Sequence, residues 1–206
     1  MKKRLVSLLL AFSMMLTFLP VGAVTAFADD GIDESKGTLI PNDNTEIYSI
    51  TEDNTTYQIR GKYNAPIEIE AKNVTINVTG DVTYDGTNYG VGVGDQNSNH
   101  NFLIRVKGDG DVTIHNEGRT ISSIGAVGGI LVTYSNNGYG GSDQKGKAVV
   151  YGGKFDSKSY KCVFTYNGEI ELHDVDVTGI GGDSTIHNRG GMITIDGGVY
   201  RGVRAI

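Results

Sequence analysis

Two short acidic turns are the residues whose types and spacing could hold a metal ion. Asp109 and Asp111 alternate with glycine in G-D-G-D, and Asp183 follows a Gly-Gly pair. Ca²⁺ prefers carboxylate and carbonyl oxygens, so these turns are candidate Ca²⁺ ligands, although neither completes the calcium-repeat pattern G-G-x-G-x-D. His115 and His187 have no acidic residue or Cys at the spacing of a metal site. The sequence therefore requires no metal or other cofactor, and solvated acidic turns are the alternative.

Three tyrosines are candidates for binding sugar. Tyr89 lies in the Gly- and Asn-rich stretch 86–101, and Tyr134 and Tyr139 lie in the stretch 134–146. Aromatic rings offer apolar faces and polar edges, which suits them to stacking on sugar rings. We expect these tyrosines to project from surface loops as ligand-binding residues, and the alternative is a surface loop with no ligand.

The element that must position these residues is a repeat of 22 and 23 residues. The segments K-A-V-V-Y-G-G-K-F, G-E-I-E-L-H-D-V-D-V and G-M-I-T-I-D-G-G-V-Y align with Val150, Leu172 and Ile195 in equivalent places. A short strand, a tight corner and a second strand cannot bury an apolar face alone, but stacked copies bury a continuous core. The repeat predicts one coil of a parallel β-solenoid.

The repeat also predicts which side chains point inward, because side chains alternate along a strand. Val150, Leu172 and Ile195 should form one buried column and Phe155, Val177 and Tyr200 a second. The predicted outward columns are Tyr151, His173 and Asp196, then Lys154, Asp176 and Val199. These outward columns mix residue types, which argues against a regular array of one ligand-binding residue.

Less regular strands precede the repeat from Thr45 onward, where apolar and polar residues alternate in short runs. Asn116, Asn167 and Asn188 each end such a run. Asn tolerates corner dihedrals and can bond backbone groups, so these residues are expected at equivalent corners, stacked as a hydrogen-bonded ladder.

The N-terminal residues 1–28 read as a secretory signal peptide. Three basic residues precede an apolar run that ends at Leu19, and Ala26-Phe27-Ala28 supplies a small-x-small cleavage pattern. Residues 29–44 are polar and are expected to be a flexible lead-in. The predicted β-solenoid domain is 45–206, with truncation at its C-terminus left open as an alternative, and we expect no membrane span in the mature chain.

The charge of the mature chain disfavours a nucleic-acid partner. Without the three basic residues of 1–28, it has 15 Lys and Arg against 24 Asp and Glu, a formal charge of −9. Cys162 has no second cysteine for an internal disulfide and is expected to be a small buried hydrophobe. Export would place the protein outside the cell, either secreted or on the cell surface.

The last coil carries a family resemblance. The segment S-T-I-H-N-R-G-G-M-I-T-I-D-G-G-V-Y-R-G at 184–202 resembles the A-I-Y-N-x-G-G-x-x-T-I-x-G-G-x-Y/F-x-G coils of right-handed parallel β-helix proteins secreted by Gram-positive bacteria, within the pectin-lyase-like class. The resemblance implies an all-β fold, a right-handed parallel β-helix of about five or six coils. The Gly-Gly corner is replaced by Asp174-Val175 in the middle coil, which departs from the pattern.

The resemblance implies several functions, because the class includes polysaccharide lyases and hydrolases, adhesins and carbohydrate-binding modules. In a lyase-like enzyme, Asp174 and Asp176 would hold Ca²⁺ and Lys154 would act as the base. A cross-strand charge pair is the simpler interpretation of Lys154 and Asp176. We therefore expect an exported, non-enzymatic surface module, glycan-binding or adhesin-like, that binds polysaccharide or a host or cell-surface glycan. The alternatives are a polysaccharide lyase-like enzyme and a structural stalk of a larger surface protein.

Overall fold

The computed structural model describes residues 33–86, 102–124, 129–134, 145–158, 161–180 and 185–202. The chain divides into two compact units, Met1–Asp33 and Glu34–Ile206, and all described strands belong to the second. In the described residues no helix has the length and apolar character needed to cross a lipid bilayer. The predicted signal peptide lies outside the described residues.

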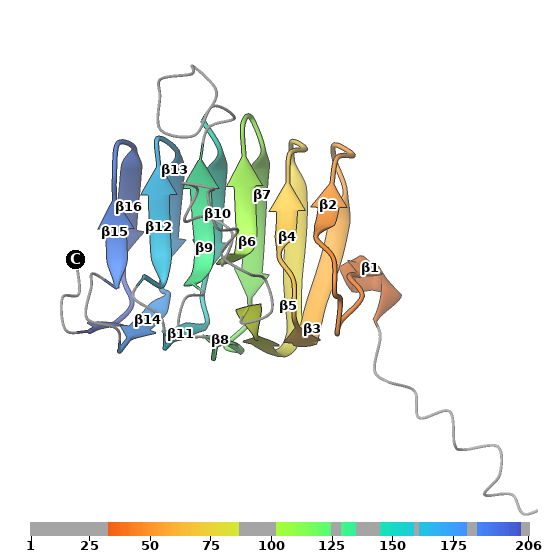
Figure 1. Cartoon of the computed structure of the whole chain (residues 1–206), viewed down its shortest axis with the longest axis horizontal. Helices are drawn as coiled ribbons and strands as arrows, with labels where there is room; N and C mark the ends of the chain where they lie inside the picture. Colours follow the sequence, from red (N-terminus) through yellow and green to blue (C-terminus); the bar gives the residue numbers. More distant parts are fainter. Residues whose placement is uncertain are drawn as a thin grey trace, which may run out of the picture. The chain divides into compact units, whose positions relative to one another are not determined.

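The second unit is built from two sheets in which every strand pair is parallel (Figure 1). The larger sheet contains β1 (Thr38–Leu39), β3 (Thr56–Tyr63), β5 (Val74–Tyr84), β7 (Asp111–Asn116), β8 (Thr120–Ser123), β10 (Lys147–Tyr151), β11 (Lys154–Ser157), β13 (Glu169–His173), β14 (Asp176–Gly179), β16 (Met192–Asp196) and β17 (Tyr200–Arg201). The smaller sheet contains β2 (Tyr48–Ile50), β4 (Ile67–Ile69), β6 (Phe102–Lys107), β9 (Gly129–Tyr134), β12 (Val163–Tyr166) and β15 (Ile186–Asn188). A short 3₁₀ helix, Glu34–Lys36, precedes β1.

Consecutive strands recur as a unit of three. The successive strands β10, β11 and β12 pair one for one with the next three strands, β13, β14 and β15. Each strand therefore lies beside its equivalent in the following turn, as stacked repeats require. In the described residues, this arrangement of parallel strands with almost no helix is consistent with a parallel β-solenoid.

The predicted register of the repeat is confirmed. Val150 lies opposite Leu172 and Leu172 opposite Ile195, while Val177 lies between Phe155 and Tyr200. These side chains belong to, or pack against, one continuous apolar core, in which Val150 and Leu172 are fully buried. Ile195 and Tyr200 are only half-buried, because β16 and β17 are the outermost described strands at that edge of the sheet.

The corner that lacks Gly-Gly keeps the left-handed conformation of its neighbours at its first residue but not at its second, where Gly153 and Gly198 have positive φ and Val175 does not. Gly152 has φ 69° and Gly197 has φ 80°, and Asp174, the equivalent residue of the middle coil, has φ 53°. Asp enters this left-handed region more readily than most non-glycine residues, so the first position of the corner is preserved. The next residue, Val175, is fully buried in the core, where glycine would contribute no side chain.

Two expectations about the strands are wrong. Order begins before Thr45, because β1 pairs with β3 and Ile40 is fully buried within the expected flexible lead-in. The asparagine ladder does not form: Asn116 ends β7 in the larger sheet, while Asn188 lies opposite Thr165 in the smaller one. Asn116 instead acts locally, its Oδ1 accepting a hydrogen bond of 2.9 Å from the Arg119 amide.

Candidate functional site

The predicted ligand-binding tyrosines do not gather in one described place. Tyr89, Tyr139 and the candidate Ca²⁺ ligand Asp183 lie outside the described residues. The expected loop position of Tyr134 is wrong, because this residue ends strand β9 and is only 7% exposed. The segment Gly129–Tyr134 is buried on both faces, so it lacks the alternation that would have marked it as a strand.

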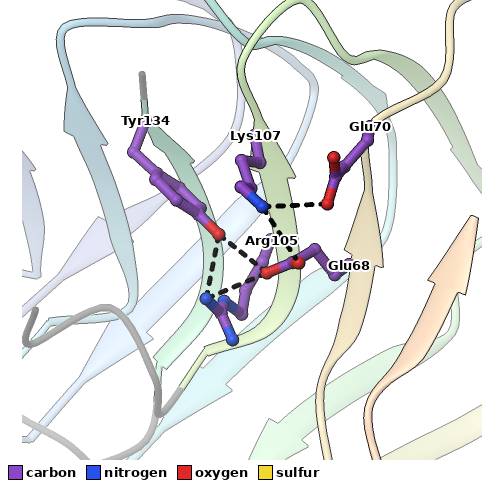
Figure 2. Close-up of polar contacts among 5 residues, drawn as sticks. All are labelled: Glu68, Glu70, Arg105, Lys107 and Tyr134. Atoms are coloured by element: carbon purple, nitrogen blue, oxygen red, sulfur yellow. Dashed lines mark hydrogen bonds and ion pairs between the residues drawn. The ribbon is translucent and has the colours of Figure 1, made fainter. Parts of the chain in front are cut away.

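Tyr134 belongs to a buried polar network on the outer side of the smaller sheet (Figure 2). Its hydroxyl donates to Glu68 Oε2 at 2.8 Å and accepts from Arg105 Nη2 at 2.9 Å. Arg105 Nη2 also lies 3.0 Å from Glu68 Oε2. Lys107 Nζ completes the network at 3.6 Å from Glu68 Oε1 and 2.9 Å from Glu70 Oε1.

The strand register explains why these residues meet. Glu68 of β4 lies directly opposite Arg105 of β6, and Lys107 lies opposite Tyr134. Ile67, Ile69, Ile104 and Val106 alternate with them and point into the core. The outward side chains of three adjacent strands are thereby brought together, with Glu68, Arg105 and Tyr134 all nearly buried.

Burial and charge shift the pKa values of this network in opposite directions. Burial favours the neutral form of Glu68, but Arg105 beside it and the hydrogen bond from Tyr134 outweigh that effect and lower the pKa of the Glu68 carboxyl. Burial raises the pKa of the Tyr134 hydroxyl. The hydrogen bond to Glu70 raises the pKa of Lys107. The network therefore holds Glu68 ionised and Lys107 protonated near neutral pH.

Aromatic residues extend the same outer side toward β15. Phe102, Val132, Tyr134, Phe164 and Tyr166 form an apolar cluster separate from the main core. Two cations cover this cluster: Lys161 Nζ lies 4.7 Å from the Phe164 ring centroid and the Arg189 guanidinium carbon 5.2 Å from that of Tyr166. Cations are attracted to aromatic faces, so rings and positive charge stabilise each other here.

A second, more open candidate site lies on the outer face of β7, β10, β13 and β16. His115, Tyr151 and His173 stand opposite one another on β7, β10 and β13. Their rings are nearly parallel: the His115 and Tyr151 centroids are 5.5 Å apart at 12°, and those of Tyr151 and His173 4.9 Å apart at 14°. We refer to these three stacked rings as the ring ladder. Tyr151, at its centre, is 44% exposed.

Charged residues border the ring ladder on the same face. His173 Nδ1 lies 3.5 Å from Asp196 Oδ2, and His173 Nε2 lies 3.5 Å from Glu171 Oε2. Lys147 Nζ lies 2.9 Å from Glu171 Oε1. This ion pair lowers the pKa of the Glu171 carboxyl and raises the pKa of the Lys147 amine. The predicted column of Tyr151, His173 and Asp196 is thus confirmed by the strand register.

The part of the ladder that sequence reasoning missed is His115. The segment D-V-T-I-H at 111–115 aligns with K-A-V-V-Y and E-I-E-L-H, and that alignment could have extended the outward column by one strand. The alignment is obscured because the equivalent residues Ile114 and Val150 are 36 positions apart, well beyond the 22–23-residue period.

The candidate Ca²⁺ ligands Asp109 and Asp111 border an open hollow beside the ring-ladder face. Gly110, Lys72, Lys145 and Lys147 complete its lining. Three lysines beside two carboxylates make this a poor environment for a divalent cation. Within the described part of the chain, no three His, Cys, Asp or Glu residues are grouped closely enough to hold a metal ion.

The residues of the lyase hypothesis are neighbours but are exposed on the surface. Lys154 lies opposite Asp176 on adjacent strands, and Asp174 occupies the corner just before. Asp176 Oδ1 accepts a hydrogen bond of 2.8 Å from the Val199 amide, so this carboxylate fastens one coil to the next. The geometry supports a structural role for Asp176 more directly than a catalytic one.

Comparison with known proteins finds no matching family, no similar curated protein and no similar solved structure. The function therefore has to follow from the residues on the chain's own surfaces.

Proposed function

We propose that this chain is an exported, non-enzymatic surface module that binds glycan on the outer face of β7, β10, β13 and β16. The fold we propose for it is a right-handed parallel β-helix of five or six coils, of the pectin-lyase-like class. The handedness follows the strong general preference of parallel crossovers for the right hand. The N-terminal sequence of residues 1–28 supports export to the cell surface or the medium.

The observation that carries the proposal is the ring ladder. Because its rings stack on one another along the coil axis, they present their edges, rather than their faces, to the ligand side. Those edges carry the Tyr151 hydroxyl and the imidazole nitrogens of His115, which both donate and accept hydrogen bonds, while the two nitrogens of His173 face Glu171 and Asp196. Sugar hydroxyls need this mixture of donors and acceptors.

The surrounding residues continue the same chemistry. Asn77 lies opposite His115, and Asp196 lies opposite His173, so hydrogen-bonding groups follow one another strand by strand. In the neighbouring outward column, Thr113 and Glu171 lie on either side of the apolar Val149. Successive groups are separated by one strand spacing, about 4.8 Å, which suits an extended polymer whose sugars lie across the strands.

A glycan-binding panel tests the proposal. The full mature chain should retain at least one extended polysaccharide, and Tyr151→Ala should weaken that binding by about fivefold or more, the loss typical of a central contact residue. Tyr151→Phe should weaken it partly, because the ring stays and the hydroxyl is lost. Ile124→Ala is the matched control, since Ile124 is also exposed (45%) but lies off this face.

Binding that is unchanged in Tyr151→Ala would remove the ring ladder from the site. Failure of the folded protein to retain any polysaccharide of the panel would reject glycan binding itself.

A further inference from the structure

The column of outward residues that carries the ring ladder continues toward the first strands of the chain. Gln58 of β3 lies opposite Asn77 of β5, and Asn77 lies opposite His115 of β7. Because side chains opposite one another share a face of the sheet, Gln58 points outward like His115. Yet Gln58 has no exposed surface, whereas His115 is exposed and Tyr151 is 44% exposed. Another segment of the chain must therefore cover the outer face at β3.

That cover is the segment 34–37, which contains the short 3₁₀ helix before β1. Gln58 Nε2 donates a hydrogen bond of 2.7 Å to the Gly37 carbonyl. Asn77 Nδ2 donates one, also of 2.7 Å, to the Lys36 carbonyl. Two outward side chains of adjacent strands thus bind main-chain oxygens of this segment, so it lies on the same face as the ring ladder. We call the segment 34–37 the wall.

The wall is fixed in place by its backbone. Gly37 has φ 105°, and a Cβ added there would lie 2.5 Å from the Thr56 carbonyl oxygen, so the main chain approaches β3 as closely as glycine allows. Directly after the wall, β1 pairs with β3 and Ile40 is fully buried. Lys36 Nζ lies 3.6 Å from Glu117 Oε1, in the corner that follows β7. The wall is therefore held at both of its ends.

The wall closes the ligand face in one direction only. Gln58 is covered and Asn77 is only partly exposed, because both side chains are held by the wall. In the other direction from His115, Tyr151 and Asp196 are exposed. A polymer that lies across the strands at His115 therefore meets main-chain atoms on one side and open surface on the other.

We propose that the wall makes the ring ladder a site for the ends of glycan chains. The terminal sugar lies over His115 against the wall, and the rest of the chain leaves across β10, β13 and β16. Chain-end binding rests on the proposed function of the ring ladder. The Lys36 amine donates hydrogen bonds and the Glu117 carboxylate accepts them, and both side chains are exposed beside the wall. They suit the end hydroxyl that a terminal sugar carries where an internal sugar is linked onward.

The test changes the number of chain ends at constant mass of polymer. Amylose, xylan, mannan and polygalacturonate are immobilised, and a polymer that retains the mature chain is then added in solution as a competitor, either intact or partly hydrolysed. A tenfold rise in the number of chains should lower the mass of competitor that releases the protein about tenfold. Binding to internal stretches would leave that mass nearly unchanged, because hydrolysis hardly alters the number of internal sites.

A single substitution removes the wall from its place. Gly37→Ala should displace it, because the added Cβ collides with the Thr56 backbone. The row of exposed groups then extends past His115, so intact polymer should compete as well per unit mass as hydrolysed polymer. Gly190→Ala is the matched control. Gly190 also has a positive φ, 79°, but a Cβ there meets no atom within 4 Å, so this variant should keep the tenfold dependence.

A mature chain that begins at Thr38 lacks the wall but keeps β1 and Ile40, and it should lose the dependence on chain ends in the same way. The proposal is overturned if hydrolysis does not change the competing mass for the unaltered chain, or if the shortened chain keeps the tenfold dependence. Either result leaves the ring ladder as a glycan site provided that Tyr151→Ala still weakens retention. Failure to retain any polysaccharide would instead reject the proposed function, and chain-end binding with it.

Discussion

Replacing Leu172 with alanine should lower the free energy of unfolding by about 3 kcal/mol. Leu172 is fully buried between Val150 and Ile195, and its neighbours are held apart by the strand pairing on both sides. Leucine-to-alanine changes in cores cost roughly 2–5 kcal/mol, and the cost is larger where the site cannot collapse around the cavity. For a unit of this length, about 3 kcal/mol corresponds to a fall in Tm of roughly 6–12 °C.

Ile195→Ala is the matched comparison, since Ile195 occupies the same column but is only half-buried. It should cost about half as much, roughly 1–2 kcal/mol, because less apolar surface leaves contact with the core. Urea unfolding followed by circular dichroism measures both variants against the unaltered chain. Equal losses for the two variants, or a loss below about 1 kcal/mol for Leu172→Ala, would show that this column does not carry the core.

Four further predictions follow from single features. Because the pKa of Glu68 is lowered in the folded state, its network stabilises the fold at pH values above the ordinary pKa of a glutamate. This stabilisation is lost as the pH falls through the lower folded-state pKa. Glu68→Gln should therefore make Tm depend less on pH on the acid side. The Met192 amide donates to the Gly168 carbonyl, and amides alternate in direction along a strand, so the Ile193 amide points away from β13. The Ile193 amide should therefore exchange with deuterium at least about tenfold faster than the Ile170 amide. Burial raises the pKa of the Cys162 thiol, and a thiol reagent should therefore label it only after denaturant is added. Polygalacturonate with Ca²⁺ should yield no unsaturated product by ultraviolet absorbance, and a Ca²⁺-dependent rise would instead favour the lyase alternative.

The regular coils could be predicted from the sequence because each one keeps the same strand and corner lengths. The 22- and 23-residue spacings place Val150, Leu172 and Ile195 in register without any knowledge of the loops. Upstream, long inserted stretches obscure the period, and equivalent strands have to be matched by side-chain pattern alone. For this reason the sequence does not align His115 with Tyr151. For the same reason it groups Asn116, which lies in the larger sheet, with Asn188, which lies in the smaller one.

The buried network was beyond prediction for a different physical reason. Glu68 and Arg105 occupy outward positions of adjacent strands in which apolar and polar residues alternate. A charged side chain at such a position is ordinarily in contact with water. Their burial depends on three strands from distant parts of the chain, and no local pattern reports that pairing. Tyr134 was misplaced for the related reason that both faces of its strand are buried.

The long strand β5 gives the stack a mechanical polarity. Its first half pairs with β7 and its second half with β8, so one uninterrupted strand spans two faces that later turns build from separate strands. β3 follows β5 along both halves, with a register shift between Ile59 and Gly61. Under a pulling force, the later turns can peel away one strand at a time at their corners. The β3–β5 pair must instead rupture along its whole length, which makes it the region that resists longest.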